Sequence, residues 1–292
     1  MTDIDASLLA RLEALRLSVR HVRWGARLGG RFTVSRRGSS IEFADYAAYA
    51  AGDDIRAIDW NLYARSDRLF VKTYKEEVEL AVEILLDTTT SMALPTAQKF
   101  DRACQLALCL ASIGLAGRHH IRMSGIQPGA PNSSAWAFHR VDLARLRTWL
   151  EAAGPRGQVR LSDWMQTTTA LRRMRGGQAL VISDCLYPLA DWFKALQALQ
   201  QRHLEVKVIQ VITPQELDPA RLVRGGLVAD SETGQPHELA YSAEELAGAV
   251  ASHNEQIAWF CKRNGVSFAQ HRLDETLERV LFQTLPARGF LE

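Results

Sequence analysis

The segment Gln178–Ser183 reads QALVIS, a short apolar run of the kind that constrains a fold most strongly. Such a run is typical of a strand buried on both faces, as in a sheet that helices cover on both sides. A second strand is expected at 78–86, where apolar and polar side chains alternate before the run closes on two leucines. Two more strands are expected at 120–126 and 205–212.

Helical periodicity returns between these strands. We expect helices over 96–116, 141–153, 162–175, 189–202 and 243–263, and a last strand and helix that close the chain. Strands that alternate with helices imply parallel β-α-β units with right-handed crossovers. The predicted fold class is therefore α/β, with a doubly wound, mostly parallel sheet. Ligands of such sheets bind beyond the carboxyl ends of the strands.

The N-terminal quarter of the chain follows a different pattern. Leucines and valines recur at three-and-four spacing over residues 6–23, which predicts a helix. Glycines then interrupt an Arg- and Asp-rich stretch up to about residue 75, which we interpret as loops with short strands. We predict an N-terminal part over 1–76, in which this helix and extension pack on the core. The main domain covers 77–292, with an irregular β insertion at about 213–241.

Composition narrows the possible functions. The formal net charge is only +2, from 35 basic and 33 acidic residues, which does not favour a nucleic-acid or membrane-surface protein. The longest apolar stretch, 106–117, is far shorter than the roughly 20 residues that span a bilayer. The four cysteines have no metal-ligand spacing and are expected to be buried, reduced thiols. These features predict a cytoplasmic protein with no membrane segment, no signal peptide and no nucleic-acid partner.

Two of the predicted strands end in aspartate. The first continues into Asp87-Thr88-Thr89-Thr90-Ser91, and the second ends at Asp184. Parallel neighbouring strands would bring both carboxylates to one edge of the sheet, with the hydroxyls of Thr89 and Ser91 between them. Such hard oxygen ligands suit Mg²⁺ or Mn²⁺. We therefore predict a metal site at Asp87, Thr89, Ser91 and Asp184; the alternative is that Asp87 and the hydroxyls cap the next helix.

The stretch before this loop carries a longer set of motifs. They are Ser35-Arg36-Arg37-Gly38-Ser39-Ser40-Ile41-Glu42-Phe43, then Asp45-Tyr46, then Gly52-Asp53-Asp54-Ile55-Arg56-Ala57-Ile58-Asp59-Trp60. With the strand-end Asp87-x-Thr-x-Ser-Met, these motifs resemble the family called domain of unknown function 58. Members of that family are similar to von Willebrand factor A domains. The resemblance covers most of the chain and implies the same fold.

The resemblance also implies a metal-ion-dependent adhesion site. In that arrangement Asp87, Thr89 and Ser91 match the first loop, and Asp184 matches the aspartate of the third. The second loop departs from the pattern, because Val159 stands roughly where a threonine is expected, and valine cannot bind a cation. The site would then be degenerate at its second loop.

Three functions are compatible with these residues. The first is a non-enzymatic protein-binding adaptor whose cation keeps one position open for a partner's carboxylate. Because family members are often encoded beside MoxR-type AAA+ ATPases, such an ATPase is the partner that the resemblance implies, in assembly or maturation of other proteins. The second is a metal-dependent hydrolase of phosphate esters, although no residue stands out as its general base. The third is a scaffold with a non-functional metal site.

Overall fold

The computed structural model describes residues 4–19, 42–49, 55, 58–75, 80–129, 132–167, 176–218, 227–229, 236–238 and 243–292. The chain divides into two compact units, which are described separately. One unit comprises Met1–Leu28 together with Leu80–Glu292, and the other comprises Gly29–Glu79. The helix at the N-terminus therefore belongs to the unit of the sheet rather than to the Arg/Asp-rich extension.

The larger unit is built on a six-stranded sheet with the order β10-β7-β6-β3-β4-β5. Its strands are β3 (Ala81–Asp87), β4 (His120–Ile126), β5 (Asn132–Ser133), β6 (Gln178–Ser183), β7 (Glu205–Ile212) and β10 (Ser267–Arg272). All neighbours pair in parallel except β4 and β5 at one edge. β6 is buried along its whole length, as its apolar run predicts.

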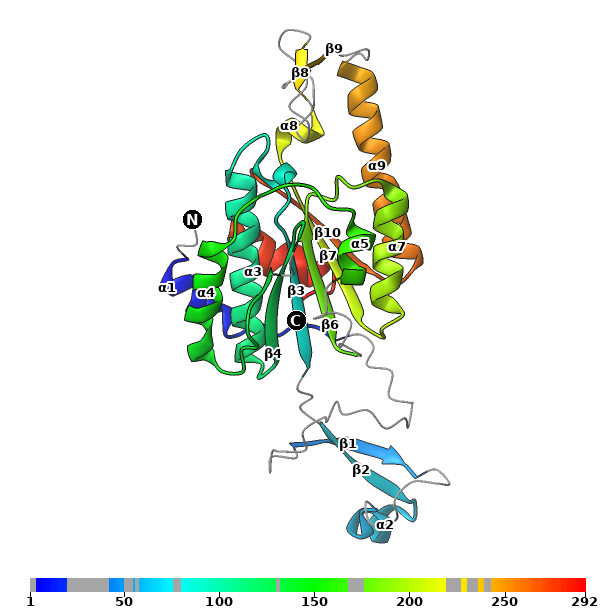
Figure 1. Ribbon diagram of the computed structural model, residues 1–292. Coiled ribbons are helices and arrows are strands. Elements are labelled where there is room, and N and C mark those ends of the chain that lie inside the picture. The colour runs from blue at the N-terminus through cyan, green and yellow to red at the C-terminus, as the bar shows by residue number, and fades with distance from the viewer. Residues whose placement is uncertain are drawn as a thin grey trace. The chain divides into compact units, whose positions relative to one another are not determined.

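Helices cover both faces of this sheet (Figure 1). One face carries α1 (Ala6–Leu12), α3 (Gln98–Ala116) and α4 (Leu143–Ala152), and the other carries α5 (Leu161–Thr167), α7 (Leu189–Gln200) and α9 (Ala243–Arg263). The second face encloses a core cluster in which Trp164, Trp192 and Ile257 come from three different helices. The α/β, doubly wound, mostly parallel fold is thus confirmed.

Shorter elements complete the unit. They are the 3-10 turns Thr90–Ala93 and Arg140–Asp142, α8 (Pro214–Leu217), the antiparallel pair β8 (Leu227–Ala229) and β9 (Pro236–Glu238), and the helical turns α10 (Leu277–Arg279), Val280–Thr284 and α11 (Leu285–Ala287). The pair β8–β9 lies within the stretch where we expect an irregular β insertion.

The N-terminal helix is shorter than its leucine spacing predicts. It ends at Leu12, and Leu17 instead forms a β-bridge with Leu291. The N–H of Arg16 donates to the carbonyl of Glu292 at 2.8 Å, and the N–H of Glu292 donates back at 3.0 Å. Leu17 is buried in this pairing, so an extended segment satisfies the apolar pattern that we interpreted as helix. Residues 20–23 of the predicted helix lie outside the described residues.

The described residues of the smaller unit form a two-stranded antiparallel sheet and one helix. They are β1 (Glu42–Ala48), α2 (Trp60–Ser66) and β2 (Phe70–Lys75). Asp59, from the motif that ends in Asp-Trp, is buried and caps α2, because its carboxylate accepts from the N–H groups of Asn61 and Leu62 at 2.9 and 3.1 Å. That motif residue therefore has a structural role. The motif at 35–41 lies outside the described residues, and packing of the extension on the core stays a prediction.

His119, which immediately precedes β4, provides a pH-dependent contribution to stability. The side chain is buried, and its Nδ1 accepts from the N–H of Leu80 at 3.4 Å. Burial, and then the charges of His120 and Arg16, lower the pKa of His119 to about 4. A histidine that stays neutral in the folded state stabilises the fold above its unfolded pKa of about 6.5, and this contribution is lost as the pH falls.

We expect the wild-type protein to lose about 2 kcal/mol more unfolding free energy between pH 7 and pH 5 than His119→Gln loses. Urea unfolding at the two pH values measures this difference. His203→Asn, at an exposed histidine, is the control and should follow the wild type. An equal loss in His119→Gln and wild type would contradict the assignment.

Candidate functional site

The carboxyl edge of the sheet brings the two predicted aspartates together. β3 and β6 are parallel neighbours; Asp87 is the last residue of β3, and Asp184 directly follows β6. Both side chains are buried, and the charge of Asp184 acts on Asp87. This juxtaposition is what two strand-terminal aspartates on adjacent parallel strands predict.

The loop after β3 turns alternate side chains to opposite sides. Oδ1 of Asp87 accepts from the Thr89 N–H at 3.0 Å and from the Thr89 hydroxyl at 2.7 Å. The Thr89 and Ser91 hydroxyl oxygens lie 3.1 Å apart. Thr88 and Thr90 face elsewhere, because their hydroxyls donate to the carbonyls of Ile126 and Gly157. Three oxygens of positions 87, 89 and 91 therefore form one cluster.

Helix capping does not explain this cluster. The next long helix, α3, begins only at Gln98. The 3-10 turn Thr90–Ala93 starts at Thr89 without a hydrogen bond from its side chain to the turn. The Thr89 hydroxyl instead bonds to the side chains of Asp87 and Ser91 within the loop.

Sequence reasoning missed the groups that hold Asp184. Its Oδ2 pairs with Nζ of Lys99 at 2.9 Å, and its Oδ1 accepts from the N–H of Leu186 at 3.1 Å. The same ammonium pairs with Oε1 of Glu216 at 2.6 Å, so Lys99 connects the loop after β6 with α8, which follows β7. Ser183 donates to Oδ2 of Asp87 at 2.6 Å and ties β6 to β3.

Electrostatics at this edge favours an additional cation. Burial, and next the charge of Asp184, raise the pKa of Asp87 to about 6, although three hydrogen bonds act in the opposite direction. Burial pulls the pKa of Lys99 down, but Asp184 and Glu216 outweigh it, and the pKa is raised. Lys99 pairs with Asp184 and Glu216, and Asp87 adds a third carboxylate at this edge, so that two negative charges are in excess when all three are ionised.

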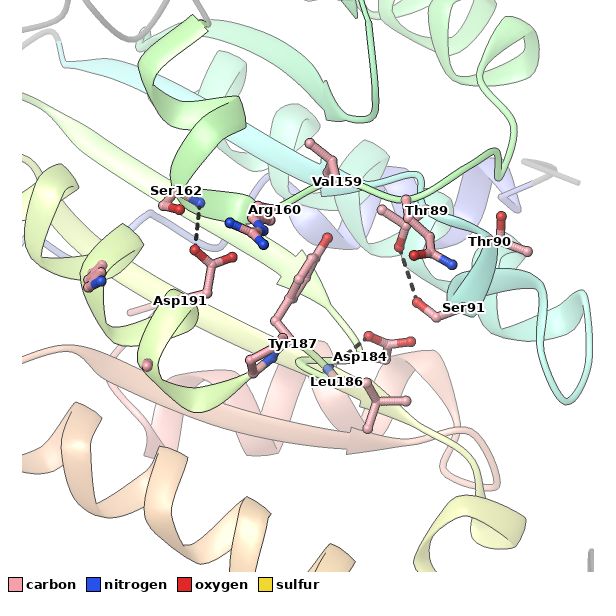
Figure 2. A pocket seen from close by; sticks show the side chains of 14 residues that line it. Thr89, Thr90, Ser91, Val159, Arg160, Ser162, Asp184, Leu186, Tyr187 and Asp191 are labelled. Carbon is pink, nitrogen blue, oxygen red and sulfur yellow. Dashed lines mark hydrogen bonds between the residues drawn. The ribbon is translucent and has the colours of Figure 1, made fainter. Parts of the chain in front are cut away.

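A cavity of about 720 Å³ opens beside the cluster. Figure 2 shows Thr89, Ser91 and Asp184 at one end of the cavity and Ser162 and Asp191 at the other. Asp191 is already used structurally, because its carboxylate accepts from the N–H groups of Leu161 and Ser162 at 2.6 and 3.2 Å at the start of α5. The exposed side chains of Arg160 and Lys194 also line the cavity.

Val159 is part of the cavity wall and also packs against the core cluster. The second loop therefore contributes no side-chain oxygen at that position. No group of three or more His, Cys, Asp and Glu side chains suited to a metal occurs in the described part of the chain. A cation would accordingly depend on hydroxyls as well as carboxylates.

The residues of the first loop fit a hard divalent cation. Octahedral Mg²⁺ with oxygens at about 2.0–2.1 Å places neighbouring ligands about 2.9 Å apart. The distances from the Thr89 hydroxyl, 2.7 Å to Asp87 and 3.1 Å to Ser91, lie on either side of this value. Asp87, Thr89 and Ser91 would hold the cation, and Asp184 would add charge beside it.

Comparison with known families shows to which family the chain belongs. The family described as protein of unknown function DUF58 matches residues 45–255, well over half of the chain. This chain belongs to the DUF58 family. Uncharacterized proteins of Mycobacterium bovis and Mycobacterium tuberculosis are 27% identical to this DUF58 protein over 282 residues, covering 92% of this chain and 86% of theirs.

Solved structures show weaker likeness to the DUF58 chain. BatB, a conserved hypothetical protein of Bacteroides thetaiotaomicron, is 16% identical, with a TM-score of 0.42 over 69% of this chain and 93% of its own. The manganese-loaded TRAP protein of Plasmodium vivax is 14% identical, with a TM-score of 0.34 over 45% and 57%. Scores this low carry no argument about function.

The prediction that the chain has no membrane segment can be tested for the described residues. Among the residues that the structure describes, no helix has the length and apolar character needed to cross a bilayer. The cytoplasmic location stays a prediction.

Proposed function

We propose that this DUF58 chain is a non-enzymatic adaptor that binds a partner protein at the carboxyl edge of its sheet. A Mg²⁺ or Mn²⁺ ion held by Asp87, Thr89 and Ser91 beside Asp184 would leave a position open for a partner's carboxylate. The observation that carries this proposal is the converging oxygen cluster at 87, 89 and 91, placed at the wall of a cavity of about 720 Å³.

The partner that the family resemblance supports is a MoxR-type AAA+ ATPase. In this proposal the DUF58 chain links that ATPase to client proteins during their assembly or maturation. The excess negative charge around Asp87 supports a cation as the intermediary, because two carboxylate surfaces would otherwise repel each other.

An enzymatic function at this edge of the sheet has less support than partner binding. Among the described residues that line the cavity, none is a histidine or a cysteine. The carboxylates of Asp87, Asp184 and Asp191 all accept hydrogen bonds from the protein itself. Neither a free general base nor a second cluster of metal ligands accompanies the first loop within the described residues.

We expect the full chain to bind its MoxR-type ATPase at least tenfold more tightly in 5 mM MgCl₂ than in EDTA (about 1.4 kcal/mol). Surface plasmon resonance with the purified ATPase measures this ratio. Asp87→Asn, which keeps the size of the side chain and removes its charge, should bind weakly in both buffers. Glu151→Gln, at an exposed position in α4, should behave as the wild type.

The outcomes separate the remaining alternatives. Equal affinity in MgCl₂ and EDTA, unaffected by Asp87→Asn, would refute the cation's role and favour the scaffold with a non-functional metal site. No binding in either buffer would refute the ATPase as partner. Turnover of a phosphate ester with Mn²⁺, lost in Asp184→Ala, would refute the non-enzymatic assignment.

A further inference from the structure

Tyr187 lies three residues beyond Asp184 and lines the same cavity as Thr89 and Ser91. Its ring stacks on that of Trp192, with a centroid distance of 5.9 Å and an interplanar angle of 4°. Trp192 is completely buried in the core, so the stack fixes the direction of the phenol. Figure 2 shows the ring extending between the two ends of the cavity, toward the side where Val159 and Thr89 lie.

The hydroxyl of Tyr187 is an unusual feature of this cavity. The residue is only 9% exposed, and among the described residues its Oη makes no hydrogen bond of good geometry, although the side chains of Thr89 and Asp87 lie near enough to affect its pKa. Buried polar groups are nearly always hydrogen-bonded, and a buried hydroxyl without a partner destabilises the fold. Phenylalanine would preserve the stack on Trp192 without this penalty. The hydroxyl therefore needs a reason other than stability.

The surroundings of the phenol indicate that reason. Burial, and then the charges of Asp87 and Asp184, raise the pKa of Tyr187 well above its ordinary value. A tyrosine phenol, with an ordinary pKa of about 10, carries its proton at pH 7 and can donate a hydrogen bond. The phenol lies near the same carboxylates as the proposed cation and comes from the third loop. The second loop lines the cavity with Gln158, Val159 and Arg160, and none of these side chains carries a hydroxyl.

We propose that Tyr187 supplies the hydroxyl that the second loop lacks at Val159, and donates a hydrogen bond to an oxygen bound by a divalent cation at Asp87, Thr89 and Ser91. This inference rests on the proposed function, because it requires a cation at the first loop. A neutral phenol is a weak ligand for a hard cation, but its O–H is suited to a supporting hydrogen bond. Loss of such a supporting hydrogen bond lowers metal affinity by about 10–100-fold.

Tyr187→Phe in the full chain tests the proposal with two readouts. We expect the Kd for Mn²⁺, measured by isothermal titration calorimetry, to rise at least tenfold. We expect the melting temperature in EDTA to stay the same or rise, because the variant removes an unsatisfied buried hydroxyl. Tyr63→Phe, at an exposed tyrosine of the smaller unit, should change neither value.

A rescue variant makes the test specific. Val159→Thr restores a hydroxyl to the second loop, and in the Tyr187→Phe background it should recover most of the lost Mn²⁺ affinity. Unchanged Mn²⁺ affinity in Tyr187→Phe would overturn the proposal, as would a melting temperature in EDTA that falls by several degrees. If the wild type binds no Mn²⁺, this inference and the cation of the proposed function are both wrong. If the wild type binds Mn²⁺ and Tyr187→Phe binds it equally tightly, the proposed function stands and the role of Tyr187 does not.

Discussion

Replacement of Lys99 by methionine is expected to lower the free energy of unfolding by about 3–5 kcal/mol. The ammonium is completely buried and pairs with Asp184 at 2.9 Å and with Glu216 at 2.6 Å. Methionine has a similar length but no charge, so both carboxylates would lose their counter-ion inside the protein. Breaking a buried ion pair on one side leaves an uncompensated charge, which is far more damaging than loss of an exposed pair.

Urea unfolding at pH 7 in EDTA measures this change without contribution from a cation. Lys194→Met, at an exposed lysine beside the same cavity, is the matched control and should change stability by no more than about 0.5 kcal/mol. Adding Asp184→Asn to Lys99→Met should recover part of the loss, because it removes one of the two unpaired charges. If Lys99→Met and Lys194→Met unfold alike, Lys99 is not the counter-ion that the geometry indicates.

The parts of the fold that depend on local patterns were predictable from the sequence. The strands Gln178–Ser183 and Glu205–Ile212 and the helix over 243–263 have the predicted limits. Each combines a clear period with clear flanking signals. The arrangement of the loop from Asp87 to Ser91 was also predictable, because the spacing of its polar residues indicated which side chains face together.

The remaining features depend on contacts between distant segments. Leu17 is buried against Leu291, and no property of its neighbours distinguishes that pairing from a longer helix. Lys99 comes from α3, and its carboxylate partners come from the loop after β6 and from α8, which follows β7. One local signal was available, because Lys99 stands one turn before the buried Ala103 on the core side of the helix. A lysine at such a position requires a buried partner.

Trp192→Ala is expected to lower the free energy of unfolding by about 3–5 kcal/mol, the usual range for removing a fully buried tryptophan. The indole lies in the core cluster between α7 and the sheet, and alanine would leave a cavity that its neighbours cannot fill. Trp259→Ala, at a tryptophan that is 60% exposed and lies beside Arg263, should cost about 1 kcal/mol or less. Guanidinium chloride unfolding of the two variants makes the comparison, and equal losses would contradict it.

Other substitutions of Trp192 test how core packing affects the proposed cation site. Tyr187 is stacked on Trp192, so the core positions the hydroxyl that we assign to the cation site. Trp192→Phe should retain an aromatic stack and most of the Mn²⁺ affinity, whereas Trp192→Leu should lose affinity to nearly the level of Tyr187→Phe while it remains folded. Equal Mn²⁺ affinity in Trp192→Phe and Trp192→Leu would show that the ring of residue 192 does not orient the phenol. A difference between them would show that core packing helps to determine metal affinity at the edge of the sheet.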